Sequence, residues 1–247
     1  MSEGAIESST PAEKEVNPWP EILLIAHRGA SERYTENTLV AFRAAIEKGA
    51  NMVELDVWRT GDGQLAVCHD HKIGDEDVRE ITLARARELN PHLCSLSEVI
   101  EFLERKGVSR WVGLYVEIKD KDPRATQLVI DYLKSREIEG RTIVGSFSEK
   151  AVRNLAQLKG EGKTEAKISW LLYSPVTTAV LRGEEWGIDY LHPWHPFFRP
   201  LDKKFIEGAH AAGLKVISGH TEDLGQIQEL KKMDIDGICS NRPGLFV

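Results

Sequence analysis

The chain has 247 residues, of which 41% are hydrophobic and 29% are charged, as in a folded protein with a sizeable core. Its net charge of −7 argues against general nucleic-acid binding, which needs basic surface to neutralise phosphates. No apolar run approaches the roughly 18–20 residues of a membrane span, so we expect no stable membrane insertion. Three widely spaced cysteines are typical of neither a disulfide framework nor a zinc site, and favour a reducing, cytoplasmic location. The oligomeric state is left open.

The first residues are polar and acidic, without the basic start and apolar middle of a signal peptide. We expect residues 1–20 to be a disordered tail that ends in a stiff proline-rich lead at 18–20. Residues 21–247 are then expected to form a single domain.

After the tail, strand-like and helix-like segments alternate along the chain. The predicted strands are 22–26, 52–57, 111–118, 141–147, 167–172, 189–192, 214–218 and 236–240. The predicted helices are 37–48, 95–106, 123–136, 149–158, 176–182, 201–212 and 222–232. Each of the first seven strands is followed by a helix, which predicts a parallel sheet in an α/β fold. Eight such units in this length fit a (β/α)8 TIM barrel. The alternative, an open doubly wound sheet, is disfavoured because no glycine-rich phosphate loop follows the first strand.

A tight-turn signal at Thr60-Gly61-Asp62-Gly63-Gln64 predicts an extra β-hairpin after the second strand. Counting back from the turn pairs Asp56 with Cys68 and Leu55 with His69. The hairpin thereby brings His69 level with the acids of the second strand.

Residues 71–91 are polar, and we expect a short insertion with little structure of its own. Ser95 and Glu98 form a capping-box pattern for the helix that follows, which Gly107 is placed to end after Lys106. Asn37 is expected to cap the helix over 37–48.

Three carboxylates, Glu54, Asp56 and Glu117, are expected at the carboxyl ends of their strands, where such barrels carry reactive groups. Acids this close repel one another unless a cation neutralises them, and an all-oxygen cluster suits Mg²⁺ or Ca²⁺. The alternative is that Arg28 and Lys119 neutralise them without a metal ion.

His27 and His69 are expected to flank the acids, where one could take a proton from a nucleophile and the other give one to a leaving group. Arg28 has the fork that matches phosphate oxygens, and Lys119 could add a second positive charge there. Five other histidines have no comparable setting and are interpreted as surface or structural residues, namely His71, His92, His192, His195 and His210.

Aromatic side chains follow several of the later strands. Phe147, Trp170, Trp194 and His220 lie near predicted strand ends. The aromatic run from Trp194 to Phe198 could line a pocket for an apolar or glycerol-like group, or it could be loop packing. The residues by themselves thus predict a barrel enzyme with two histidines and a carboxylate-bound metal, acting on a phosphate ester.

The chain resembles the glycerophosphodiester phosphodiesterase family through motifs that occur in the family's order after residue 21. The motifs are His27-Arg28-Gly29, Glu36-Asn37-Thr38, Glu54-Leu55-Asp56-Val57, Asp62-Gly63, His69-Asp70, Glu117-Ile118-Lys119, Ser146-Phe147, and Asp236-Gly237-Ile238 with Pro243. Together they are specific, whereas a single His-Arg-Gly would be weak.

The resemblance implies a TIM barrel that hydrolyses small-molecule glycerophosphodiesters to glycerol 3-phosphate and an alcohol, with roles in lipid and glycerol metabolism. It implies one divalent cation, Mg²⁺ or Ca²⁺, on Glu54, Asp56 and Glu117. His27 and His69 become the catalytic acid/base pair. Arg28 and Lys119 are then expected to bind the phosphate, and Phe147 and Trp194 are expected to contribute to substrate binding beside them. By similarity to the bacterial phosphatidylinositol-specific phospholipases, a cyclic phosphate is the expected intermediate.

The chain departs from the family pattern at some positions around the site. Lys72 begins the segment in which the family usually has Arg-Thr-Thr, and Ser218-Gly219-His220-Thr221 stands near the usual Trp-Thr. These changes spare the predicted reaction centre and bear on the choice of alcohol. Two other functions stay open, namely a lysophospholipase D or phospholipase acting on lipids, and a non-catalytic barrel that binds phosphodiesters.

Overall fold

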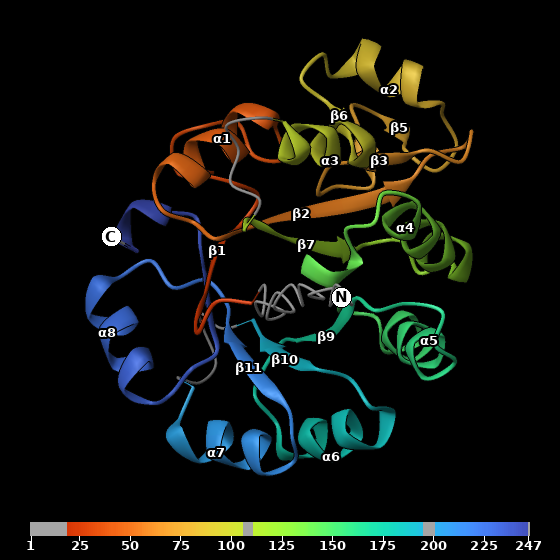
Figure 1. The fold of residues 1–247 in the computed structure, drawn as a ribbon. Coiled ribbons are helices and arrows are strands. Elements are labelled where there is room, and N and C mark those ends of the chain that lie inside the picture. The colour runs from red at the N-terminus through yellow and green to blue at the C-terminus, as the bar shows by residue number, and fades with distance from the viewer. Residues whose placement is uncertain (1–18, 106–110, 195–200, 247) are drawn as a thin grey trace, which may run out of the picture.

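Parallel strands form a ring at the centre of the molecule, and helices stand around it (Figure 1). This arrangement is a computed structural model that describes residues 19–105, 111–194 and 201–246. Neighbouring strands pair in parallel in the order β1-β2-β7-β8-β9-β10-β11-β12, and β12 pairs again with β1. The predicted closed (β/α)8 barrel is therefore confirmed.

The elements agree with the predicted alternation of strands and helices. The barrel strands are β1 (Leu23–Ala26), β2 (Met52–Arg59), β7 (Gly113–Ile118), β8 (Thr142–Ser146), β9 (Lys167–Leu172), β10 (Tyr190–Pro193), β11 (Lys215–Ser218) and β12 (Gly237–Ser240). The helices between them are α1 (Leu39–Glu47), α3 (Leu96–Glu104), α4 (Pro123–Ser135), α5 (Glu149–Gly160), α6 (Thr177–Trp186), α7 (Lys203–Ala211) and α8 (Leu224–Lys232). The described part of the chain also has the 3₁₀ turns η1 (Glu139–Arg141) and η2 (Pro243–Leu245).

The barrel strands are buried on both faces, and this divides the core into two parts. One part lies between the sheet and the surrounding helices. The other fills the barrel interior and consists of Leu23, Ile25, Met52, Tyr115, Ile143, Leu171, Tyr190, Ile217 and Cys239. Because side chains alternate along a strand, each interior residue fixes which later residues of its strand also face inward. This alternation decides which side chains reach the mouth of the barrel.

The predicted hairpin after the second strand is confirmed. Strand β3 (Leu65–Val67) runs antiparallel to β2, and its Val67 lies opposite Val57. The amide of Cys68 donates to the carbonyl oxygen of Asp56 at 3.1 Å, as the predicted register requires. Strand β6 (Cys94–Ser95) adds to the other side of β3 and leads into α3.

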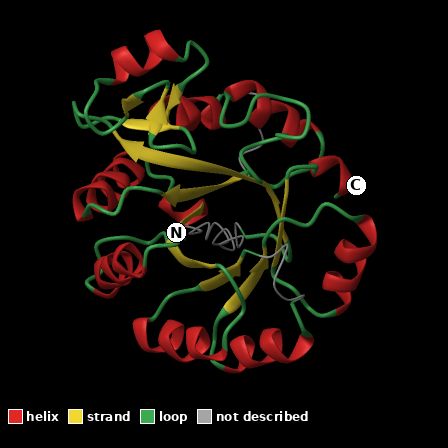
Figure 2. Ribbon diagram, turned by 180° about the vertical axis from the view of Figure 1, so that it is seen from behind, coloured by secondary structure: helices red, strands yellow, loops and turns green. Residues whose placement is uncertain are grey.

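The prediction that the insertion over 71–91 lacks structure is wrong. It contains the two-stranded pair β4 (Lys72–Ile73) and β5 (Glu76–Asp77), followed by helix α2 (Leu83–Leu89). Ile73, Val78 and Ala86 belong to a small hydrophobic cluster under these elements. The apolar residues are too few and too irregularly spaced to reveal a helix or strand period, yet they suffice for a cluster beside the hairpin. Figure 2 shows this unit outside the ring of strands, next to α3.

The predicted capping box at the start of α3 is confirmed. The Ser95 hydroxyl accepts from the Glu98 amide, and the Glu98 carboxylate accepts from the Ser95 amide, so the capping box is present. Helix α3 ends at Glu104, and the predicted end at Lys106 and Gly107 lies outside the described residues. The expected tail at 1–20 lies outside them as far as residue 18, and Trp19 packs against the interior cluster. Within the described residues, no helix is long and apolar enough to cross a bilayer.

Candidate active site

The acids of the site come from the inward-facing positions of two adjacent strands. On β2, Met52 belongs to the interior cluster, and Glu54 and Asp56 follow it at two-residue steps. On β7, Glu117 lies opposite Asp56 in the parallel register, and Lys119 comes two residues later. Alternation along paired strands thus stacks apolar residues at the bottom of the barrel and ionisable residues at its carboxyl end.

Glu54, Asp56 and Glu117 form a buried cluster in which one carboxylate oxygen of each lies within 4.8 Å of the others. Burial, followed by repulsion from Asp56, raises the pKa of Glu117 to about 7. The same two causes raise the pKa of Glu54. Burial would also raise the pKa of Asp56, but Lys119 and Arg28 together lower it. The cluster therefore holds more negative charge than its surroundings readily accommodate.

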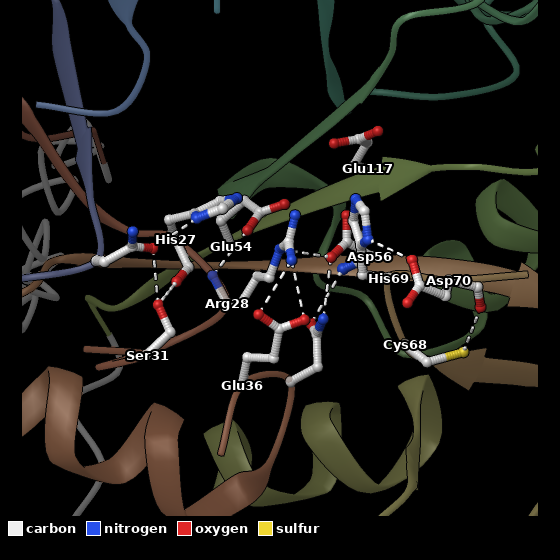
Figure 3. A network of polar contacts seen from close by, with 12 residues as sticks. His27, Arg28, Ser31, Glu36, Glu54, Asp56, Cys68, His69, Asp70 and Glu117 are labelled. Atoms are coloured by element: carbon white, nitrogen blue, oxygen red, sulfur yellow. Dashed lines mark hydrogen bonds and ion pairs between the residues drawn. The ribbon is translucent and has the colours of Figure 1, made fainter. Parts of the chain in front are cut away.

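Two cationic side chains of the described residues reach the cluster. Lys119 Nζ lies 2.8 Å from Glu117 Oε1 and 3.3 Å from Asp56 Oδ1. Arg28 Nε lies 3.0 Å from Asp56 Oδ2, and the Arg28 backbone amide donates to Glu54 Oε2 at 2.8 Å. The guanidinium also contacts both oxygens of Glu36 through Nη1, at 2.9 and 3.0 Å. Figure 3 shows this guanidinium between the acids and Glu36.

The donor set fits a divalent cation of the Mg²⁺ or Ca²⁺ type. Its three ligands are all carboxylates, which these hard cations prefer. Among the described residues, Arg28 and Lys119 contact the acids, yet the pKa values of Glu54 and Glu117 are still raised. The two cationic side chains therefore do not fully stabilise the ionised form of all three acids, and a divalent cation would do so.

The prediction that Asn37 caps α1 is wrong, because the cap is Thr38, whose side chain accepts from the Ala41 amide. Asn37 instead holds Asp56 at both its backbone and its side chain. Its Nδ2 donates to Asp56 Oδ2 at 2.9 Å, and its Oδ1 accepts from the Asp56 amide at 3.2 Å. Its φ of +56° turns the side chain back toward β2, in a left-handed conformation that asparagine tolerates better than most residues. Asn37 is therefore a support of the acid cluster.

His27 follows β1 and is only 5% exposed. Its Nδ1 lies 2.7 Å from Asn241 Oδ1 and 3.0 Å from His220 Nε2. Burial, then the charge of Arg28 and the neighbouring His220, lowers the pKa of His27 to about 3. His27 is consequently neutral at physiological pH and is able to accept a proton.

His69 follows β3 and has a different setting, with 37% of its side chain exposed. Its Nδ1 lies 2.9 Å from Asp70 Oδ1. It lines a cavity of about 210 Å³ together with Glu36 and Asn37, which hold Arg28 and Asp56 respectively. In Figure 3 its ring projects toward the side of the site on which Glu117 lies. The structure thus brings His69 to the mouth from the hairpin side.

Phe147 and Trp194 are linked to His27 by ring contacts. The ring of Trp194 lies 5.0 Å from that of His27 and 6.3 Å from that of Phe147, and Phe147 stacks on Tyr173 at 4.7 Å. An aromatic wall therefore runs from His27 to the exposed Tyr173. The rest of the predicted aromatic run, 195–198, lies outside the described residues.

Three residues near the centre are not among the site residues that the sequence predicts. Asn241 and His220 contact His27, and His192 is buried inside the barrel with its Nδ1 3.1 Å from the Tyr115 hydroxyl.

The alternation of side chains along a strand could have identified two of these residues. Asn241 comes two residues after the interior Cys239, and His192 comes two residues after the interior Tyr190. No such period marks His220, which lies beyond the end of β11.

A (β/α)8 barrel with acids, imidazoles and cationic side chains gathered at its carboxyl mouth defines a barrel enzyme, because this end is where such barrels carry their active sites. Its family is established by a match between residues 27–245 and the model of the glycerophosphoryl diester phosphodiesterase family. The chain belongs to that family, as the motifs predicted.

Individual relatives agree with this assignment. A glycerophosphodiester phosphodiesterase of Caldanaerobacter subterraneus subsp. tengcongensis is 28% identical over 247 residues, which cover 91% of this chain and 96% of the relative. The crystal structure of the glycerophosphodiester phosphodiesterase of Thermotoga maritima superposes with a TM-score of 0.72 at 28% identity, covering 91% of this chain and 96% of that one. An Oleispira antarctica phosphodiesterase, solved in complex with the product sn-glycerol-3-phosphate, shares the fold with a TM-score of 0.75 at 24% identity, covering 92% of this chain and 94% of that one.

Proposed function

We propose that this protein hydrolyses glycerophosphodiesters to glycerol 3-phosphate and an alcohol, with a small-molecule diester as substrate. The observation that carries the proposal is the convergence of three buried acids, two cationic side chains and the neutral His27 at one end of the barrel. Membership of the family gives this convergence its reaction class.

Glu54, Asp56 and Glu117 would hold one divalent cation, Mg²⁺ or Ca²⁺. When bound, such an ion supplies positive charge that stabilises the growing charge on the phosphoryl oxygens. Arg28 and Lys119 bind other phosphate oxygens, since both lie beside the acids and carry fixed positive charge. They thereby orient the phosphorus between the two histidines.

His27 and His69 move the protons. In the first step a hydroxyl of the glycerol moiety attacks phosphorus, and its proton passes to Nε2 of His27. The bond from phosphorus to the alcohol breaks, and His69 gives a proton to the departing oxygen. Water then opens the cyclic phosphate, with the proton transfers reversed. The low pKa keeps His27 neutral before the reaction, and the negative charge of the bound diester would raise that pKa toward the range in which a general base is effective.

Phe147 and Trp194 would present apolar surface to the carbon atoms of the substrate. Their ring contacts with His27 and with each other place this surface beside the reaction centre. Tyr173, which is 73% exposed, continues the wall to the rim. This exposed rim favours a second candidate, a lysophospholipase D activity, in which the rim contacts the lipid chain. That candidate requires the rate on lysophospholipids to rise when the substrate forms micelles.

We also propose that the protein is located in the cytoplasm. All three cysteines are free thiols, two of them buried, which supports the reducing, cytoplasmic compartment that the composition favours.

The test is a turnover assay over a panel of glycerophosphodiesters, with and without chelator, on the wild type and on Glu117→Gln. We expect the variant to lose about a thousandfold or more in kcat with an unchanged fold by circular dichroism, since it removes one charged ligand from the cluster. Glu139→Gln is the matched control. Glu139 is also buried, but it lies at η1, before the start of β8 and so at the opposite end of the barrel.

Two outcomes of this assay would contradict the proposal. Hydrolysis that survives both exhaustive chelation and Glu117→Gln would remove the metal centre from the proposal. Binding of glycerophosphocholine without any turnover, with the metal ion supplied, would favour the non-catalytic barrel instead.

A further inference from the structure

Two side chains that the reaction scheme does not use meet at one atom of His27. Asn241 Oδ1 lies 2.7 Å from Nδ1 of His27, and Nε2 of His220 lies 3.0 Å from the same nitrogen. The contact between Asn241 Nδ2 and His220 Nε2, at 3.3 Å, closes a triangle. These residues follow β12 and β11, and they are 214 and 193 positions from His27 in the sequence. Barrel closure alone brings them together.

With the Asn241 amide oriented as in this structure, the hydrogen-bonding capacity of each atom assigns the protons of the triangle. An amide oxygen accepts only, so Asn241 Oδ1 requires that Nδ1 of His27 carry the proton. The amide nitrogen of Asn241 donates only, so Nε2 of His220 must be the acceptor, and the proton of that ring sits on its Nδ1. The lone pair of His220 Nε2 then also faces the N–H of His27. Every donor in the triangle meets an acceptor.

The position of Asn241 is held by contacts outside the triangle. The hydroxyl of Ser31 lies 2.7 Å from Asn241 Oδ1 and 2.8 Å from the backbone carbonyl oxygen of His27, and the Asn241 backbone amide donates to Glu222 Oε1 at 2.8 Å. The reversed amide would turn a donor toward Nδ1 of His27 and force the ring proton onto Nε2. Nε2 could then take no proton from a substrate hydroxyl.

The position of His220 is held in a strained backbone and by ring packing. Its φ is +38°, a conformation that residues other than glycine seldom adopt and that persists where surrounding contacts impose it. Its ring lies 4.6 Å from the ring of His27 and 4.3 Å from that of Trp194. Water has little access to the buried His27 to replace these partners.

We propose that Asn241 and His220 are positioning residues that fix the tautomer of His27, with the proton on Nδ1 and the lone pair of Nε2 free for the substrate. His220 acts through Asn241, because its unprotonated Nε2 accepts the amide hydrogen and so selects the amide orientation. The tautomer itself is independent of the proposed function; only its use as a base rests on it.

The first experiment reads the tautomer without any turnover. Nitrogen NMR of the full-length protein with ¹⁵N-labelled histidine separates protonated from bare ring nitrogens at neutral pH. We expect Nδ1–H with a bare Nε2 for His27, and Nδ1–H for His220. A His27 ring that carries its proton on Nε2 would overturn the inference, whatever the enzyme activity.

The second experiment perturbs the triangle. His220→Phe keeps a ring against Trp194 but removes the acceptor, and we expect mixed tautomers of His27 with a kcat about 10- to 100-fold lower and an unchanged KM. His220→Gln can present an amide oxygen as acceptor and should restore both the single tautomer and most of kcat. His210→Gln, on the outer helix α7, is the control and should change neither.

The nitrogen spectrum of His27 and the turnover rate test the tautomer and the proposed function independently. An unchanged His27 spectrum and kcat in His220→Phe would reject the role of His220. If His220→Phe unfolds, His220→Leu takes its place as a variant without an acceptor, and an unchanged His27 spectrum in that variant would equally reject the role of His220. The expected tautomer in a protein that turns over no diester would support the inference and reject the proposed function.

Discussion

Two regions bring a histidine to the same mouth by different means. The loop after β1, residues 27–37, delivers His27, which is 5% exposed and is held by partners from the far end of the chain. The β2–β3 hairpin delivers His69, whose side chain is 37% exposed and contacts its sequence neighbour Asp70. The first setting depends on closure of the whole barrel, and the second depends on a turn of a few residues.

The backbone of the two regions shows the same contrast. In the β1 loop Arg28, Gly29 and Asn37 all have positive φ, and each is tied to β2 or α1. In the hairpin, Thr60 and Gln64 bond to each other across the turn. The β1 loop is thus a tightly held part of the core that positions Arg28 and Asn37 against the acids, whereas the hairpin is a local unit that carries His69. Substitutions in the two regions should therefore differ in their effects.

The largest expected effect is on catalysis. His27→Gln should lower kcat by about a thousandfold or more, because general acid–base catalysis contributes about 10²–10⁴ and the Gln side chain cannot take a proton. His69→Gln should lower kcat by about 10²-fold with natural substrates. A diester with an activated leaving group, such as a nitrophenyl ester, should rescue His69→Gln but not His27→Gln. Steady-state kinetics with both substrates measures this, and equal rescue of the two variants would contradict the assigned roles.

The second effect is on stability. A Cβ added at Gly29 would lie 2.7 Å from backbone and side-chain atoms of Ala41, and its φ is +85°. Gly29→Ala should therefore lower the free energy of unfolding by about 3 kcal/mol or more, through overpacking and backbone strain. Gly63 in the hairpin has a similar φ of +78° but open space around it, so Gly63→Ala should cost about 1 kcal/mol. Urea unfolding of both variants measures the difference, and similar losses would show that the β1 loop yields as easily as the turn.

The third effect is on acid stability. Burial, and then His220, lowers the pKa of His192 to about 3, while an unfolded histidine has a pKa of about 6.5. Below that value the unfolded chain binds a proton that the folded chain does not, so this group's contribution to stability falls as the pH drops toward about 3. Between about pH 7 and pH 5 the loss is about 2 kcal/mol for this group.

His192→Phe removes the titrating ring and should flatten the pH dependence of the unfolding free energy by about that amount. The lost contact with the Tyr115 hydroxyl lowers stability equally at each pH, so only the slope carries the test. His210→Gln, a partly exposed histidine on α7, serves as the control. An unchanged slope in His192→Phe would contradict a neutral, buried imidazole.

The smallest effect lies in the hairpin. Asp62 accepts hydrogen bonds from the Thr60 hydroxyl and from the Leu83 amide, which joins the turn to the start of α2. Asp62→Ala should cost about 1 kcal/mol, and kcat should change less than twofold because the register of β2 and β3 is fixed by the ladder. A large loss of activity would mean that the turn positions His69 more tightly than its exposure suggests.

The sequence by itself determined the alternation of strands and helices, the hairpin register and the family. These features depend on short-range rules, since alternation along a strand, turn residues and caps act within a few positions. The acids Glu54, Asp56 and Glu117 could be predicted for the same reason, because each is a fixed step from an apolar strand residue and the strands are parallel. The strands and the helix of the insertion over 71–91 could not be predicted, because its few apolar residues show no period of their own.

Only the tertiary structure decided how those groups are supported. The sequence predicts Asn37 as a cap of the nearest helix, yet its side chain turns to Asp56 on β2. Asn241 and His220 lie some two hundred residues from His27 and meet it only because β12 closes against β1. Local preferences do not encode such contacts, since a contact between distant segments depends on how all the strands between them pack.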